Sequence, residues 1–135
     1  MRTSLDAEQL KNDIVARIEE LSGENVYACY QCGRCSAGCP GIEAMDLLPN
    51  QVIRLLQMGQ VDEVLRCKTI WACASCFTCE SRCPKGVDLT RIMEAVRQII
   101  LRQNIDHAKL AELPDEMIED LPQAALVSGF RKLTS

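Results

Sequence analysis

The sequence predicts an all-α protein, and two observations support this fold class. Apolar residues recur every three or four positions in the segments 4–22, 49–59, 61–65 and 88–103, as on the buried face of a helix. There is little sign of strands between these segments. At 135 residues and 47% apolar content, the chain suits one compact domain with a tail.

The N-terminal segment, residues 1–23, predicts an amphipathic helix. We expect this helix from Ser4 to about Ser22, where Gly23 follows as a stop. The residues after Met1 do not form an apolar signal segment, so we expect a protein of the reducing cytoplasm. The apolar stripe of the helix consists of Leu10, Ile14, Ile18 and Leu21.

Eight of the nine cysteines form one pattern written twice. The pattern Cys-x-x-Cys-x-x-Cys-x-x-x-Cys-Pro begins at Cys29 and again, 44 positions later, at Cys73. We call residues 29–40 and 73–84 the first and second cysteine runs. Four thiolates at this spacing are the ligands of 4Fe-4S clusters in two-cluster ferredoxins. The sequence therefore predicts two 4Fe-4S clusters and an electron carrier.

The fourth cysteine of each run raises the question of which cluster it binds. In the bacterial ferredoxins that share this pattern, it ligates the cluster of the other run. Carried over by position, this rule gives two crossed sets that would pin the halves of the domain together. The first set is Cys29, Cys32, Cys35 and Cys83, and the second set is Cys73, Cys76, Cys79 and Cys39.

The two runs differ in glycine content. In the first run, Gly33 and Gly38 can take positive φ, which lets the backbone come close to a cluster and point N–H groups at its sulfur atoms. The second run has Phe77 and Arg82 at the corresponding positions. We therefore expect different surroundings and different reduction potentials for the two clusters.

Zinc and disulfides are the alternative uses of so many cysteines. Structural zinc sites pair two Cys-x-x-Cys units or combine Cys with His, whereas each run here has three cysteines in one stretch and His107 lies far from both. A disulfide framework fits less well still, because the cysteine count is odd. Cys67 lies outside both runs, and we interpret it as a small buried side chain rather than as a spare thiol.

Helices are also expected between and after the runs. Pro49 can open a helix that Gly59 ends, and a shorter helical turn follows. After the second run, Asp88 is suited to be the N-cap of a helix through about Gln103. Bacterial-type ferredoxins link their clusters with short loops and small strands, so this helical linker predicts an all-helical ferredoxin domain over residues 24–104.

The last segment, residues 105–135, has a different character. Pro114 and Pro122 interrupt it, acidic residues cluster between them, and an apolar patch precedes Gly129. This C-terminal extension could be a docking arm that orders on a neighbouring subunit. The alternative is a short helix folded on the domain itself.

Charge and motif content argue against several function classes. The formal net charge is −4 at pH 7, and the sequence has no basic stripe interleaved with aromatic residues, so nucleic acid is not an expected partner. No run approaches the roughly 20 apolar residues that span a bilayer, so direct membrane insertion is not expected. The sequence also has no Gly-x-Gly-x-x-Gly nucleotide loop. We assign no catalytic residue.

The cysteine runs with their flanks, residues 28–40 and 71–88, resemble the iron-sulfur C subunit of heterodisulfide reductase. The likeness covers roughly residues 24–104. It implies an α-helical ferredoxin-like component of a soluble oxidoreductase complex, with two 4Fe-4S clusters. It also implies two partners: a flavin- and iron-sulfur-containing A-type donor, and a catalytic B-type acceptor with a Cys-Cys-Gly motif, where a disulfide is reduced. No two cysteines are adjacent in this chain, so the disulfide chemistry is expected elsewhere.

Other functions stay open at this point. In methanogens the family acts on the mixed disulfide of coenzymes M and B, while related complexes of sulfur metabolism use similar subunits with other substrates. A quinone-linked oxidoreductase would use a similar iron-sulfur relay. A cluster-containing redox sensor is an alternative of a different class.

Overall fold

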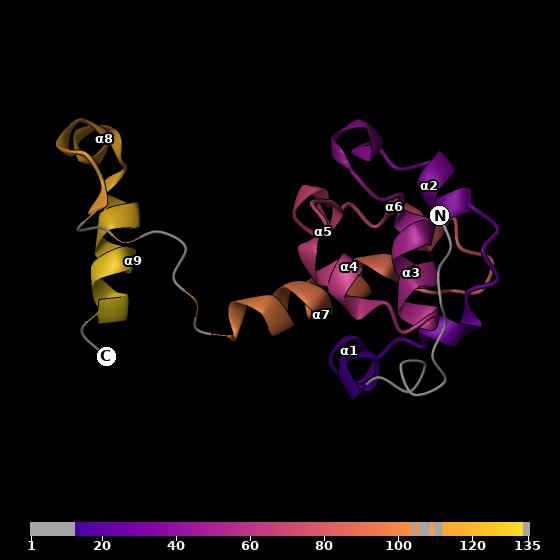
Figure 1. The fold of residues 1–135 in the computed structure, drawn as a ribbon. Coiled ribbons are helices and arrows are strands. Elements are labelled where there is room, and N and C mark those ends of the chain that lie inside the picture. The colour runs from indigo at the N-terminus through magenta and orange to yellow at the C-terminus, as the bar shows by residue number, and fades with distance from the viewer. Residues whose placement is uncertain (1–12, 104, 106–108, 110–111, 134–135) are drawn as a thin grey trace. The chain divides into compact units, whose positions relative to one another are not determined.

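The computed structural model describes residues 13–103, 105, 109 and 112–133. Every element of regular structure in these ranges is a helix, which confirms the all-α class (Figure 1). The chain divides into two compact units, residues 1–103 and 104–135. The finer division at residue 23 stays a prediction.

The N-terminal helix is described from its second half onward. Helix α1 spans Asp13–Ser22, and the predicted residues before it lie outside the described part of the chain. Gly23 ends the helix with a φ of 71° and donates its N–H to the Glu19 carbonyl at 2.8 Å. The helix packs on α7 (Leu89–Leu101) and buries Val15, which the predicted stripe left out, together with Ile18.

Each cysteine run is built from the same two local elements. A helical turn ends at the first cysteine: η2 (Val26–Ala28) precedes Cys29, and α5 (Thr69–Ala72) precedes Cys73. A second short helix then carries the third cysteine, α2 (Arg34–Ala37) in the first run and α6 (Thr78–Ser81) in the second. Helices α2 and α6 pack against each other, so the two runs meet in the domain.

The segment between the runs is helical, as predicted. After the turn η3 (Ile42–Ala44), helix α3 spans Pro49–Gln57 with Pro49 in its first turn, where the missing N–H costs nothing. Gly59 follows with a φ of 70°, and α4 covers Val61–Arg66. Helix α3 packs on α4 and on α2, which places it beside the first cysteine run.

Helix α7 follows the second run. Asp88 is its N-cap, as predicted, because the carboxylate accepts hydrogen bonds from the backbone N–H of Thr90 at 2.9 Å and of Arg91 at 3.3 Å. The helix ends at Leu101, two residues before the predicted end. It packs against α1, α4, α5 and α6 and so forms the centre of the first unit.

The internal repeat extends beyond the cysteines into helices α3 and α7. The two helices share five buried positions among their first eight, and these positions are 40 residues apart rather than 44 because the loop after the second run is shorter. Each half of the domain is therefore a cysteine run followed by one amphipathic helix. The paired buried residues are Pro49 and Leu89, Val52 and Ile92, Ile53 and Met93, Leu55 and Ala95, and Leu56 and Val96.

The hydrophobic core is aliphatic and lies between the helices that flank the runs. Ile18, Leu56, Ile70 and Ile92 are its largest fully buried side chains, apart from Met93. Cys67 joins this core with 5% of its surface exposed, as the packing interpretation predicts. The aromatic side chains that the structure describes, Tyr27, Tyr30, Trp71 and Phe77, are instead all at least half exposed.

The described part of the second unit includes helices α8 and α9. Helix α8 spans Asp115–Asp120 and α9 spans Gln123–Leu133. Pro114 and Pro122 directly precede these helices, in agreement with the predicted breaks. Met117 on α8 and Val127 on α9 are 51% and 56% exposed.

The core position of Ile92 gives a first prediction. Replacing Ile92, which is 0% exposed, with Ala should lower the free energy of unfolding by about 2–5 kcal/mol, because the lost contacts leave a cavity. Leu101→Ala, at a residue of the same helix that is 64% exposed, should stay within about 0.5 kcal/mol of the parent. Denaturant unfolding of the metal-loaded protein under anoxic conditions measures both, and equal losses would contradict the assignment of the core.

Candidate metal centres

Two cavities lie beside the cysteine runs, and each is lined by the first three cysteines of one run together with the fourth cysteine of the other; Cys79 also reaches the first cavity. The first cavity brings together Cys29, Cys32 and Cys35 of the first run with Cys83 of the second. The second cavity brings together Cys73, Cys76 and Cys79 of the second run with Cys39 of the first. The cavities enclose about 350 and 340 Å³ of space, their open mouths included, so they are of similar size.

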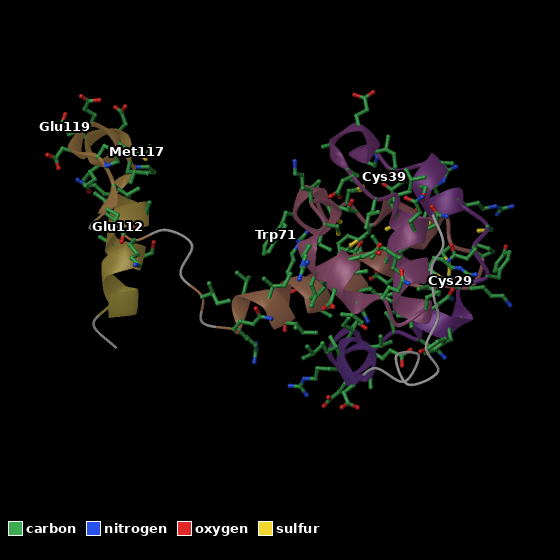
Figure 2. All side chains as sticks on the ribbon, in the orientation of Figure 1. Cys29, Cys39, Trp71, Glu112, Met117 and Glu119 are labelled. Carbon is green, nitrogen blue, oxygen red and sulfur yellow. The ribbon has the colours of Figure 1, made fainter. Side chains whose placement is uncertain are left out.

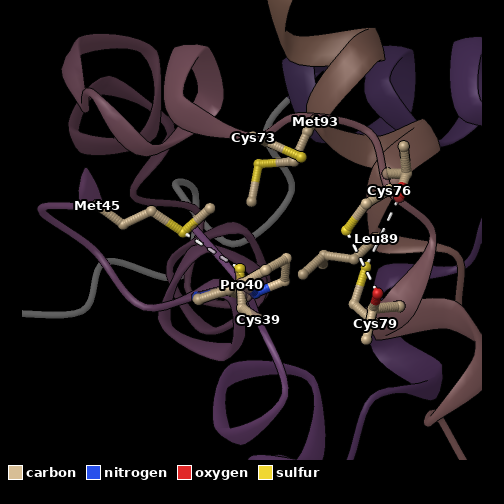
Figure 3. Close-up of a pocket in the computed structure, with 11 residues that line it drawn as sticks. Cys39, Pro40, Met45, Cys73, Cys76, Cys79, Leu89 and Met93 are labelled. Carbon is tan, nitrogen blue, oxygen red and sulfur yellow. Dashed lines mark hydrogen bonds between the residues drawn. The ribbon is translucent and has the colours of Figure 1, made fainter. Parts of the chain in front are cut away.

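The second cavity shows how the crossing is made. In Figure 3, Cys39 and Met45 lie on one side of the cavity, across from Cys76 and Cys79, with Cys73 on a third side. The packing of α2 on α6 makes this possible, because it carries the end of each run to the start of the other. Cys79 and Leu89 line both cavities, so the two sites are direct neighbours.

The cysteine arrangement fits a cluster better than a single ion. Zinc would draw its ligating sulfurs to about 2.3 Å from one centre. Within the described ranges, no three Cys, His, Asp or Glu side chains lie close enough together to hold one metal ion. The sulfurs are spread around a cavity instead, which suits a cubane whose four iron corners are separate points of attachment.

The backbone of the two runs repeats in detail. In the first run, φ is positive at Gln31 (62°) and Gly33 (76°), and in the second run it is positive at Ser75 (53°) and Phe77 (58°), the same two positions. Left-handed backbone at non-glycine residues costs energy and persists where the surrounding structure enforces it. The conformation that wraps three cysteines around a cavity is therefore the same in both runs, although Gly33 alone signals it in the sequence.

The expectation of positive φ at Gly38 is wrong. Gly38 has a φ of −109°, which any residue can adopt. A Cβ atom at this position would lie 2.5 Å from Nε of Arg82, the residue that occupies the equivalent position of the second run. Glycine therefore provides space for Arg82 where the two runs meet.

Polar groups surround the sulfur atoms of the first cavity. The Gln31 Nε2 amide donates to Cys29 Sγ at 3.5 Å, and the backbone N–H of Val87 donates to Cys83 Sγ at 3.4 Å. The Ser36 hydroxyl lies 3.9 Å from its neighbour Cys35 Sγ. The two N–H donors stabilise negative charge on sulfur and can tune a bound metal, whereas the Ser36 hydroxyl donates its hydrogen to Asn50 Oδ1 at 2.6 Å.

The second cavity has sulfur contacts of a similar kind in the described residues. Cys76 Sγ lies 3.4 Å from the Thr78 hydroxyl, and Cys79 Sγ lies 3.6 Å from the Thr90 hydroxyl. Cys39 Sγ lies 3.9 Å from the thioether of Met45. Thr90 occupies the position on α7 that Asn50, which lines the first cavity, occupies on α3. The repeat thus includes the helix residues that line the cavities.

The thiols of each run differ in acidity in the same order. A hydrogen bond from the Arg34 backbone N–H lowers the pKa of the exposed Cys32, and a hydrogen bond to the Thr78 side chain lowers the pKa of the exposed Cys76. Burial raises the pKa of the third cysteine in each run, Cys35 and Cys79. In each run the second cysteine is therefore more readily ionised than the third.

Long side chains hold the backbone at the start of each run. The Gln57 Nε2 amide at the end of α3 donates to the carbonyl oxygens of Val26 at 2.9 Å and Cys29 at 2.8 Å. The Arg97 guanidinium on α7 donates in the same way to the carbonyl oxygens of Ile70 and Cys73. Sequence reasoning missed both residues, although their matching places in the two helix repeats could have indicated them.

Asp46 ties the loop after the first run to the turn before the second. Its carboxylate accepts hydrogen bonds from the backbone N–H groups of Lys68 at 2.8 Å and Thr69 at 2.9 Å, and from the Thr69 hydroxyl at 2.8 Å. These hydrogen bonds lower the pKa of Asp46 from 3.8 to about 2, and the bond from the Lys68 N–H has the largest effect. The contact fixes α5, and so the approach to Cys73.

The chain contains a recognised iron-sulfur domain. Residues 28–88, which include both cysteine runs, match the family model of a 4Fe-4S dicluster domain. This match agrees with the predicted cofactor class and with the helical fold. Within the described residues, the structure contains no helix with the length and apolar character required to cross a membrane.

The relatives that the chain matches come from one kind of enzyme complex. The chain is 35% identical over 96 residues to the iron-sulfur C subunit of the CoB–CoM heterodisulfide reductase of Methanopyrus kandleri, covering 71% of this chain and 50% of that protein. It is 36% identical over 103 residues to the C2 subunit of the H2/formate:CoB–CoM heterodisulfide,ferredoxin reductase of Methanococcus maripaludis. This match covers 70% of this chain and 55% of that protein. The C subunit of the H2:CoB–CoM heterodisulfide,ferredoxin reductase of Methanothermobacter marburgensis is 31% identical over 81 residues. This match covers 60% of this chain and 44% of that protein.

The chain thus resembles the iron-sulfur C subunits of heterodisulfide reductases, and the predicted resemblance is confirmed. It spans about half the length of the curated relatives it matches. Those relatives are subunits of an oxidoreductase complex.

The contacts of Asp46 give a second prediction. Asp46→Ala should lower the free energy of unfolding by about 0.5–1 kcal/mol, at the lower end of the capping range because the side chain is exposed. The pKa of Asp46 is lowered in the folded chain, so its contribution is present above about pH 4 and disappears as the pH falls towards 2. Thermal unfolding at a series of pH values measures this. Glu43→Ala, also exposed, is the control, and equal effects of the two variants would refute the role of Asp46.

Proposed function

We propose that this chain binds two 4Fe-4S clusters through the crossed cysteine sets and relays electrons between two partner subunits. The observation that carries the proposal is the pair of cavities of similar size, each lined by three cysteines of one run and the fourth cysteine of the other, with Cys79 and Leu89 lining both. When bound, each cluster accepts and returns one electron without a change in its ligands. Because Cys79 and Leu89 line both cavities, the two clusters would lie close enough together for electron transfer between them.

The exposed cysteine at each cavity supports a relay with two ends. Cys32 and Cys76 are exposed, whereas the other six cysteines of the runs are partly buried. Each site thus has one open edge, where an electron can enter or leave, and a covered remainder that excludes water. Two edges suit one contact with a donor and one with an acceptor.

Exposed aromatic side chains next to these edges support protein docking there. Tyr30 is 56% exposed and its hydrogen bond with Cys32 raises its pKa, while Lys85 Nζ lies 6.0 Å from its ring. Phe77, adjacent to Cys76, is 50% exposed, and Trp71 is 52% exposed and projects from the domain (Figure 2). Aromatic residues of this kind are enriched at protein interfaces.

The partners follow from the relatives. Their names place them in complexes that reduce a heterodisulfide, in some cases with ferredoxin. We infer that a flavin- and iron-sulfur-containing protein of the A type donates electrons to this chain, and that a Cys-Cys-Gly protein of the B type accepts them in the cytoplasm. Purification of the chain under anoxic conditions tests this inference. Recovery with a membrane quinone oxidoreductase, or without any redox partner, would contradict it.

Cluster ligation gives a third prediction. The chain reconstituted under anoxic conditions should contain about eight irons and show two reversible one-electron EPR signals. Cys83→Ser should damage the cluster of the first cavity, although Cys83 lies in the second run, and Cys39→Ser should damage that of the second.

Cys67→Ala is the matched control for these substitutions. Cys67 is buried in the aliphatic core and lines neither cavity, so its removal should leave the iron content and both signals unchanged. Loss of the second-cavity signal in Cys83→Ser, with the first signal intact, would show that each run ligates its own cluster.

The C-terminal unit gives a fourth prediction. We propose that residues 105–135 act as a docking arm on a neighbouring subunit, which the exposure of Met117 and Val127 supports. Deleting residues 123–135 should weaken recovery of the complex while leaving the iron content of the chain unchanged. Unchanged complex assembly, measured by co-purification from the same cells, would remove the support for the arm.

A further inference from the structure

We propose that Arg97 makes the cluster of the second cavity the one with the higher reduction potential and thereby gives the relay a direction. The proposal rests on the proposed function, because it requires a cluster in each cavity. It concerns the surroundings of the clusters and adds no ligand. Arg97 acts through the backbone of Cys73, so it is a tuning residue rather than a ligand.

Gln57 and Arg97 occupy equivalent positions in the two halves of the domain. They are the ninth residues of α3 and α7, both half-buried, and each donates to the carbonyl oxygen of the first cysteine of its own run. Each also donates to a carbonyl in the helical turn before that cysteine, Val26 or Ile70. The two side chains therefore perform the same structural task at the two cavities.

Their charges differ. Gln57 is neutral, whereas the guanidinium of Arg97 carries a positive charge. Within the described residues, no carboxylate lies within ion-pair distance of Arg97, so no nearby negative charge cancels it. A half-buried charge is also screened less by salt than an exposed one. The guanidinium thus places a net positive charge beside the backbone of Cys73.

Reduction adds one negative charge to a cluster, so a nearby cation favours the reduced form. Polar or thioether contacts with cysteine sulfur are present at both cavities, and the further hydrogen bonds of Cys32 with the Arg34 N–H and Tyr30 lie at the exposed edge of the first cavity, where solvent screens them. The other cations in or beside the runs, Arg34, Arg82 and Lys85, are exposed and therefore better screened. The main buried difference is Gln57 against Arg97.

A redox titration monitored by EPR on the reconstituted full chain tests the proposal. Arg97→Gln should lower the reduced-to-oxidised ratio of the second-cavity cluster at least tenfold at a fixed potential, which is about 59 mV for a one-electron couple. Gln57→Arg should have the opposite effect at the first cavity, where it should raise the reduced-to-oxidised ratio of the cluster. The Cys39→Ser variant assigns the signals, since it alters that of the second cavity.

Two further variants separate charge from position. Arg97→Lys keeps the charge but loses the forked donor, so it should retain most of the parent potential. Arg102→Gln removes an exposed charge from the end of the same helix and should change neither cluster. Unchanged potentials in Arg97→Gln and Gln57→Arg, or an equal fall in Arg97→Lys and Arg97→Gln, would overturn the proposal.

Failure of the proposal can be told from failure of the proposed function. If the parent chain does not hold two clusters, the iron content and the number of EPR signals show this before any variant is made. If both clusters are present and neither Arg97→Gln nor Gln57→Arg shifts a potential, the tuning role alone is refuted. The Gln57→Arg variant also keeps the test available should Arg97→Gln fail to fold.

Discussion

The packing of α2 on α6 is the contact on which the rest of the domain depends. These short helices carry the third cysteine of each run, and their contact brings the fourth cysteine of each run to the cavity of the other. Gly38 leaves room for Arg82 at this point, so the two runs can approach closely. Neither cavity has four cysteines without the other half of the chain. Metal binding and folding of the domain are for this reason expected to be coupled.

The distribution of side-chain types agrees with this coupling. The core is small and aliphatic, while the described aromatic residues are at least half exposed, beside or near the cysteine runs. Large rings that would stabilise a core of this size are thus placed where a partner can cover them. We therefore expect a larger share of the stability to come from bound metal, while the surface around the cysteine runs can serve recognition.

The sequence was sufficient where the signal is local. Pro49, Gly59 and Asp88 mark the limits of α3 and the start of α7 through the conformation or the hydrogen bonds of their own neighbourhood. Contacts between distant segments could not be predicted. The hydrogen bonds of Gln57 and Arg97 are examples, because the sequence of a helix does not show which distant carbonyl a polar side chain reaches. Gly38 was misread because glycine can provide space as well as positive φ.

A duplicated domain has a consequence for electron transfer. Two halves with the same backbone, a similar cavity size and similar sulfur contacts would give two sites of similar potential, between which an electron moves equally in both directions. A relay between a donor and an acceptor works better when the sites differ, and the difference must arise where the repeat is broken. In the described structure, the two halves differ in the lengths of their loops and in the residue types of the cysteine runs. They also differ in one charge near the first cysteine of each run, where Gln57 is replaced by its equivalent Arg97. Because a change of charge leaves the shared scaffold intact, it can separate the two sites without weakening either cysteine cage.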